Sequence, residues 1–138
     1  MTQYLLVKDA MSRDNYTVQA NASVEEAAAQ MQKHQLPGAP VLNERQELIG
    51  FVSEHDLLRQ LLEASYHSTS KASVMDVMQT RVLSVKPDDS IIELAQQMAQ
   101  LDQPKIYPVI ANGKVEGVIT RGQLLKALIQ NRAQISRV

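Results

Sequence analysis

The 138-residue chain contains no cysteine, which excludes a disulfide framework, a thiolate nucleophile and a zinc site built from cysteines. It also has little net charge, −1, because 14 lysines and arginines nearly balance 15 aspartates and glutamates. Such a chain has no overall field that attracts nucleic acid or anionic lipid, so we expect neither as a partner. No run of about 18 apolar residues is present, and we therefore expect a cytoplasmic protein without a membrane span.

The short motifs of common enzymes and metal sites are also missing. The sequence has no G-x-S-x-G elbow, no P-loop and no G-x-G-x-x-G. Its three histidines, His34, His55 and His67, do not have the spacing of metal ligands. Because no nucleophile, base and orienting group occur together, we predict neither an enzyme nor a metal site.

The sequence does contain an internal duplication. A V-x-D-x-M segment at Val7–Met11 recurs 67 residues later at Val74–Met78. The same offset relates Val18 to Val85, Ser23 to Ser90, Met31 to Met98, Gly50 to Gly117 and Leu57 to Leu124. The register slips by one residue at Pro40 and Pro108, and a shorter turn at Asn112-Gly113 restores it. The chain therefore holds two repeats.

Each repeat predicts the order β-α-β-β-α. Ser23 with Glu26, and Ser90 with Glu93, are S-x-x-E capping boxes that begin a helix with one apolar stripe. The buried strands that follow are expected at Ala39–Leu42, Leu48–Ser53, Ile106–Ile110 and Val115–Thr120. A second, leucine-rich helix ends each repeat. We expect one module over residues 1–138, with repeats at 7–63 and 74–131 and a polar linker at 64–73.

The doubled V-x-D-x-M openings and the segments GFVSEHDLL (Gly50–Leu58) and GVITRGQLL (Gly117–Leu125) resemble the cystathionine-β-synthase (CBS) domain family. The resemblance covers nearly the whole chain. It implies an α+β fold (α/β in the broad sense) of two repeats that pack through their sheets about a pseudo-twofold axis. It also implies two clefts that hold adenine nucleotides, a homodimer formed through helices, and regulation of another protein.

In the first repeat, the resemblance assigns a ribose to Asp56. The physical reason is that a carboxylate accepts hydrogen bonds from both hydroxyl groups of a ribose. Ser53 and the amides of the helix start are placed to meet a phosphate, and His55 adds charge if it is protonated. A plain alternative stays open, because Ser53 and Asp56 also have the spacing of a helix-capping box. The two roles are compatible.

The second repeat departs from the family pattern, because Gln123 stands where an aspartate is expected. An amide offers one acceptor oxygen instead of two, so we expect this second cleft, with Thr120, Arg121 and Gln123, to be weak or empty. Arg121 matches a phosphate, but it is equally explained as a solvated surface charge.

The resemblance also implies that the base lies against the partner repeat. Carried onto this chain, the cleft at Asp56 would be completed by Thr80, Val82, Lys105, Ile106, Tyr107 and Pro108. Lys105 would meet phosphate and Tyr107 would flank the base, whereas their alternative roles are an exposed charge and a strand residue.

Two functions remain in competition. The first is a regulatory sensor that binds AMP, ADP, ATP or S-adenosylmethionine and changes the behaviour of a partner protein. The second is a ligand-independent interaction module, in which paired repeats present a dimer surface. No cofactor is obligatory in either.

Overall fold

The chain folds into two compact units that do not coincide with the sequence repeats. The computed structural model describes residues 4–13, 16–67 and 72–136. One unit, called here the first-repeat unit, is Tyr16–Val82, and the other, the second-repeat unit, consists of residues 1–15 and 83–138. Each unit has its own hydrophobic core.

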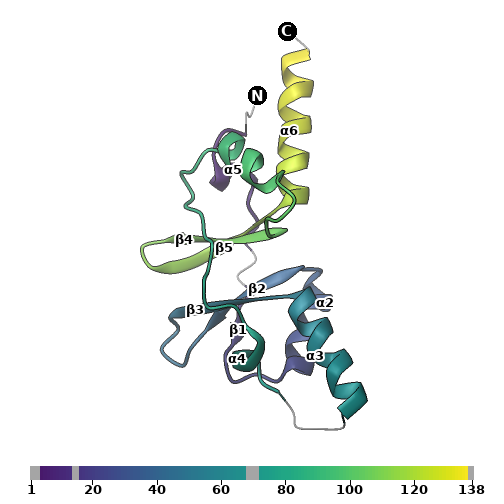
Figure 1. Cartoon of the computed structure of the whole chain (residues 1–138). Helices are drawn as coiled ribbons and strands as arrows, with labels where there is room; N and C mark the ends of the chain where they lie inside the picture. Colours follow the sequence, from purple (N-terminus) through teal and green to yellow (C-terminus); the bar gives the residue numbers. More distant parts are fainter. Residues whose placement is uncertain (1–3, 14–15, 68–71, 137–138) are drawn as a thin grey trace. The chain divides into compact units, whose positions relative to one another are not determined.

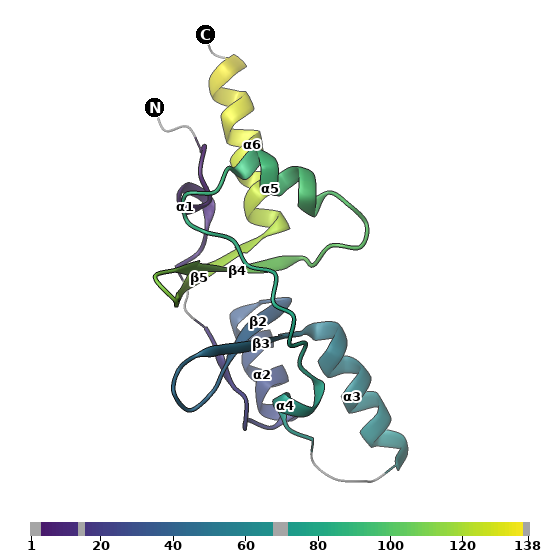
Figure 2. The ribbon, with the colours of Figure 1, turned by 60° about the vertical axis from the view of Figure 1, so that its left-hand side comes forward.

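The first-repeat unit is a three-stranded sheet covered by helices (Figures 1 and 2). Strand β1 (Val18–Gln19) pairs parallel with β2 (Gly38–Leu42), and β2 pairs antiparallel with β3 (Leu48–Ser53). Helices α2 (Val24–His34) and α3 (Glu54–His67) pack against each other. The α2 stripe predicted from sequence points into the core, where Val24, Ala27 and Met31 are buried.

The second-repeat unit repeats this plan with a shorter sheet. Strands β4 (Ile106–Ala111) and β5 (Lys114–Thr120) form an antiparallel hairpin, and α5 (Ile91–Met98) packs on α6 (Arg121–Ser136). Asn112 and Gly113 both have positive φ, 54° and 76°, as a tight two-residue hairpin turn requires. The predicted first strand of this repeat is reduced to one parallel bridge between Val85 and Val109.

The opening segments of the two repeats are exchanged between the units. Helix α1 (Val7–Ala10) belongs to the first repeat by sequence, but Val7 is fully buried in the core of the second-repeat unit. Helix α4 (Val74–Val77) begins the second repeat, and Val74 is fully buried in the core of the first-repeat unit. Each core is thus completed by the segment that opens the other repeat.

The exchanged segments explain the V-x-D-x-M pattern residue by residue. The valines fill the cores, as described. Asp76 Oδ2 accepts from the Ser73 amide at 2.9 Å, and Asp9 Oδ2 accepts from the Leu6 amide at 2.9 Å, so both aspartates cap the short helices. The methionines lie against strand glycines, Met78 at Gly50 and Met11 at Gly117.

One predicted boundary differs from the structure. Helix α3 continues through His67, four residues into the segment 64–73 that the sequence suggested as the linker. Ala64 favours helix intrinsically, and Ser65 stays in the helix with its hydroxyl bonded to the Leu61 carbonyl at 2.9 Å. A polar composition therefore did not stop the helix here.

Candidate functional site: the junction of β3 and α3

Ser53 and Asp56 form a reciprocal capping box where β3 becomes α3. The Asp56 amide donates to Ser53 Oγ at 3.1 Å. In return, Asp56 Oδ2 accepts from the Ser53 amide at 3.2 Å and from the Ser53 hydroxyl at 2.9 Å. The capping role left open by the sequence is therefore present, and it fixes the orientation of the carboxylate.

A further donor to this carboxylate is Gln79, which the sequence did not single out. Its Nε2 lies 3.2 Å from Asp56 Oδ2. All the hydrogen bonds to this carboxylate thus end on Oδ2, and within residues 4–13, 16–67 and 72–136 no donor reaches Oδ1. One carboxylate oxygen is held in place while the other keeps its acceptor capacity for a ligand.

Gln79 reaches Asp56 because its backbone pairs with β3. The amides and carbonyls of Phe51 and Gln79 exchange two hydrogen bonds of 2.8 Å. The bridge is antiparallel, so the chain that continues from Gln79 through Thr80 to Val82 leaves Phe51 in the direction of the start of β3. Of the predicted site residues, the first-repeat unit therefore groups Ser53 and Asp56, with Thr80 one residue beyond Gln79.

His55 does not share the surroundings of Asp56. Asp56 lines a hollow of about 180 Å³ with Arg59, Gln60, Glu63 and Val77. His55 instead lines an apolar groove between α2 and α3, together with Leu58 and Leu61. Consecutive helical residues point about 100° apart, so sequence adjacency did not place the imidazole beside the carboxylate.

The hollow at Asp56 is too small to enclose a nucleotide by itself. Pockets that bury small ligands typically measure about 300–1,000 Å³, against about 180 Å³ here. A nucleotide held at Asp56 would need a wall beyond these five residues.

In the second-repeat unit, Thr120 and Gln123 form the equivalent capping box. Gln123 Oε1 accepts from the Thr120 amide at 2.8 Å, and the Gln123 amide donates to Thr120 Oγ1 at 3.2 Å. The one acceptor oxygen of this side chain thus already accepts one hydrogen bond, which leaves one lone pair. Arg121 lines a different feature, the apolar groove between α5 and α6.

The segment from Lys105 to Pro108 enters β4. Lys105 is exposed, and its carbonyl accepts from the Arg121 amide at 3.1 Å. Ile106, Tyr107 and Pro108 are buried. The Tyr107 hydroxyl donates to Gln103 Oε1 at 2.7 Å, and burial raises the pKa of this phenol above its ordinary value of 10.0, against the opposing hydrogen bond from Gln97. The contacts of Tyr107 are those of a core residue.

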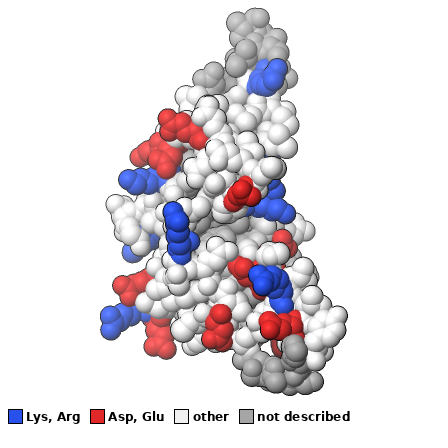
Figure 3. All heavy atoms as spheres, viewed as in Figure 1, with Lys and Arg blue, Asp and Glu red and all other residues white. Residues whose placement is uncertain are grey.

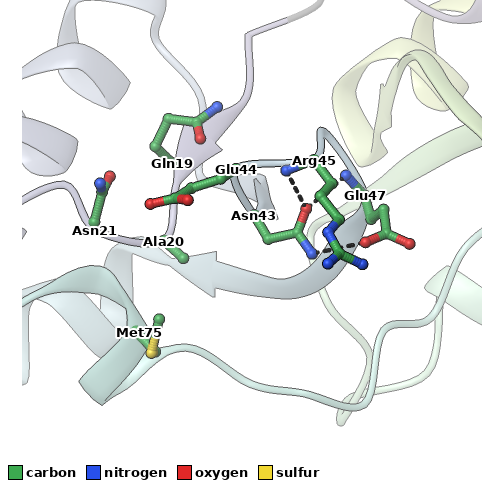
Figure 4. A pocket seen from close by; sticks show the side chains of 8 residues that line it. All are labelled: Gln19, Ala20, Asn21, Asn43, Glu44, Arg45, Glu47 and Met75. Carbon is green, nitrogen blue, oxygen red and sulfur yellow. Dashed lines mark hydrogen bonds between the residues drawn. The ribbon is translucent and has the colours of Figure 1, made fainter.

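A separate polar hollow of about 340 Å³ lies at the far end of β3, beside the turn after β2 (Figure 4). Its main polar groups already serve that turn. Asn43 Oδ1 accepts from the amides of Arg45 and Glu47 at 2.9 Å, and Asn43 Nδ2 donates to Glu47 Oε1 at 3.0 Å. The local hydrogen bonds account for these side chains without a ligand.

Charges of both signs are interspersed on the face shown in Figure 3. Within the described part of the chain, no helix is long and apolar enough to cross a membrane. Over those same residues, no three His, Cys, Asp or Glu side chains gather as a metal site would require.

The fold and the two matching strand-to-helix junctions agree with a comparison against protein families. The family model of the CBS domain matches residues 7–63 and 74–130. The chain belongs to the CBS domain family. Its two CBS repeats form a tandem pair with an α+β fold, as the resemblance implied.

The chain is also similar to a known bacterial protein and to solved structures of CBS-pair proteins. Protein YlbB of Bacillus subtilis is 31% identical over 119 residues, which cover 86% of this chain and 78% of YlbB. The crystal structure of CBSX2, an Arabidopsis thaliana CBS-pair protein, in complex with AMP is 26% identical, has a TM-score of 0.76, and covers 94% of this chain and 99% of that one. The CBS domain pair of MJ0100, in complex with 5′-methylthioadenosine and S-adenosyl-L-methionine, is 24% identical, has a TM-score of 0.77, and covers 92% and 97%.

Proposed function

We propose that this CBS pair is a non-catalytic sensor in the cytoplasm that binds an adenine nucleotide and modulates a partner protein. The observation that carries the proposal is the Asp56 carboxylate, held by three donors on Oδ2 and unoccupied by the described residues on Oδ1. The family membership and the AMP complex of CBSX2, at 26% identity, support the choice of ligand. We infer that the sensor acts as a homodimer.

At the ribose, Oδ1 accepts one hydroxyl directly. Oδ2 takes the second hydroxyl when Gln79 turns away, since the Gln79 side chain is exposed and its bond to Asp56 is among the longest there, at 3.2 Å. Ser53 lies at the start of α3, where its hydroxyl and the first amides of the helix suit a phosphate. Thr80, Val82, Lys105, Ile106, Tyr107 and Pro108 are proposed to supply the remaining wall, on the strength of the family resemblance.

We propose one nucleotide for each chain. In the second repeat, Gln123 replaces the carboxylate and its oxygen serves the Thr120 amide, so a ribose finds fewer acceptors there. Arg121 lines the apolar groove between α5 and α6, and we propose that it acts as a surface charge and does not compensate for the missing carboxylate.

Isothermal titration of the full chain with AMP, ADP, ATP and S-adenosylmethionine tests the proposal. Asp56→Asn keeps an oxygen for the Ser53 amide but loses the charged acceptor pair, and is expected to weaken binding about 10- to 100-fold. Asp76→Asn is the matched control, since Asp76 caps Ser73 in the same unit with the same geometry. It should bind like the wild type.

Equal binding by the wild type and Asp56→Asn would reject Asp56 as the ribose ligand. Failure of the wild type to bind any of the four compounds would favour the second function, a ligand-independent interaction module. That alternative is supported by the full use of Ser53 and Oδ2 in helix capping.

A further inference from the structure

The Asp56 carboxylate accepts one hydrogen bond that helix capping does not need. The bonds from the Ser53 amide and hydroxyl span three residues and belong to the capping box. The third bond, from Gln79 Nε2 at 3.2 Å, joins residues 23 positions apart. All three donors end on Oδ2, although a carboxylate oxygen has only about two lone-pair positions. The Gln79 bond is therefore the one that can be given up without loss of the cap.

The side chain of Gln79 can leave Asp56 while its backbone stays in place. The amides of Phe51 and Gln79 each donate to the carbonyl of the other residue at 2.8 Å, which holds the Gln79 backbone against β3. Gln79 is exposed, so water can take over the hydrogen bonds of its carboxamide when the side chain turns. An exchange of donors on Asp56 Oδ2 thus requires only a change of side-chain rotamer.

The other repeat has a shorter side chain at the position equivalent to Gln79. Ser12 lies 67 residues before Gln79 and forms the same antiparallel bridge, with Val118 in the place of Phe51. The two hydrogen bonds of that bridge are 2.9 and 3.1 Å long. Because the bridge forms with either side chain, the carboxamide of Gln79 is not needed to hold the segment. What the carboxamide adds is its bond to Asp56.

We infer that Gln79 determines the specificity of the ribose site, because it competes with one of the two ribose hydroxyl groups for Asp56 Oδ2. This inference rests on the proposed function, in which Asp56 accepts both hydroxyl groups. A nucleotide with one hydroxyl group, such as 2′-deoxy-AMP or 3′-deoxy-AMP, needs only Oδ1 and leaves Gln79 in place. AMP must displace Gln79 to gain its second hydrogen bond, so its affinity falls with the fraction of molecules in which Gln79 occupies Oδ2. Gln79 thus reduces the preference for ribose over deoxyribose.

Isothermal titration of the full chain with AMP, 2′-deoxy-AMP and 3′-deoxy-AMP tests the competition. Gln79→Ser introduces the residue that the other repeat carries in the same bridge, so the backbone pairing should persist. Gln79→Met keeps a long side chain but removes the donor. Both variants should bind AMP about 3- to 10-fold more tightly than the wild type, the effect of one net hydrogen bond, and should bind the two deoxynucleotides within about 2-fold of the wild type.

Gln60→Ser is the matched control. Gln60 lines the same hollow as Asp56, but among the described residues only Ser53 and Gln79 donate to that carboxylate. Loss of the Gln60 amide should therefore leave the ratio of the affinities for AMP and the deoxynucleotides unchanged.

The side-chain amide resonance of Gln79 in a nitrogen-15 NMR spectrum gives a second readout. Addition of AMP to the wild type should move this resonance toward its position in Asp56→Ala, where the carboxylate is missing. Addition of 2′-deoxy-AMP should move it less, because one hydroxyl group does not displace Gln79.

Unchanged or weaker AMP binding by both Gln79 variants would overturn the competition, as would an equal change in the affinities for all three nucleotides. Those results leave the sensor proposal standing. The sensor proposal fails in a different way, if the wild type binds none of the nucleotides or if Asp56→Asn binds them equally well, and either result would overturn this inference as well. Circular dichroism of each variant checks that a change in affinity is not a loss of fold.

Discussion

The side-chain amide of Asn131 holds the backbone of Tyr4 by two hydrogen bonds. Asn131 Oδ1 accepts from the Tyr4 amide at 2.8 Å, and Asn131 Nδ2 donates to the Tyr4 carbonyl at 2.7 Å. These bonds join residues 127 positions apart. They fasten the start of the chain to α6, just before the segment that places Val7 in the core of the second-repeat unit.

Asn131→Ala should therefore loosen the N-terminal segment. Loss of both bonds is expected to lower the free energy of unfolding by about 1–2 kcal/mol, measured by urea denaturation. Amide exchange should speed up at Leu6 and Val7 before it changes in β4. The control is Gln130→Ala on the same helix, which removes no hydrogen bond found in the described structure. An equal loss of stability in both variants would argue against the Asn131 clamp.

Gly50→Ala and Gly117→Ala should both destabilise the chain. A Cβ at Gly50 would lie 2.5 Å from Met78 Sδ and 2.9 Å from the Gln79 carbonyl oxygen, and one at Gly117 would lie 2.8 Å from Met11 Cε and also overlap the Ser12 carbonyl. Because backbone atoms block both positions, the exchanged segments would be displaced, at a cost of about 1–3 kcal/mol or more. Thermal unfolding followed by circular dichroism measures the loss.

Gly122→Ala is the matched control for these two substitutions. Its added Cβ would have only Thr120 Oγ1 nearby, at 3.8 Å, and the residue lies in the first turn of α6. Alanine costs about 0.5–1 kcal/mol less than glycine within a helix, so this variant should be as stable as the wild type or more stable. If Gly122→Ala lost as much stability as the strand variants, close approach would not be the reason for the strand glycines.

Most of the fold could be predicted because each local pattern occurs in both repeats, so that every helix or strand is indicated by two sequences. The capping serines Ser23 and Ser90 accept from the amides three residues on, at 3.0 and 3.3 Å, and begin α2 and α5 as expected. The four strands predicted with residue ranges all form, within one residue at each end, whereas the expected opening strand of the second repeat is reduced to one bridge. The exchange of α1 and α4 was not predicted, because a repeating pattern does not show which core its first segment joins.

The candidate site was predictable only where a local motif fixes the geometry. Ser53 and Asp56 come together because their spacing suits a cap. Gln79 was missed because it reaches Asp56 through a pairing 28 residues away from Phe51, which no local pattern encodes. His55 and Arg121 point into the helix grooves, since neighbours on a helix face different directions.

Because the opening segments are exchanged, a substitution in the opening segment of one repeat should destabilise the unit formed by the other repeat. Val7→Ala removes two methyl groups from the core of the second-repeat unit, and Val74→Ala does the same in the first-repeat unit. Each substitution should lower the free energy of unfolding by about 2 kcal/mol, the value of a fully buried valine side chain.

Native-state hydrogen exchange shows in which unit the stability is lost. Val7→Ala should speed up amide exchange in β4 and β5 more than in β2 and β3. Val74→Ala should do the reverse, even though each valine lies in the other repeat by sequence. If Val7→Ala instead sped up amide exchange mainly in β2 and β3, the opening segment would pack on its own repeat, contrary to the exchanged arrangement.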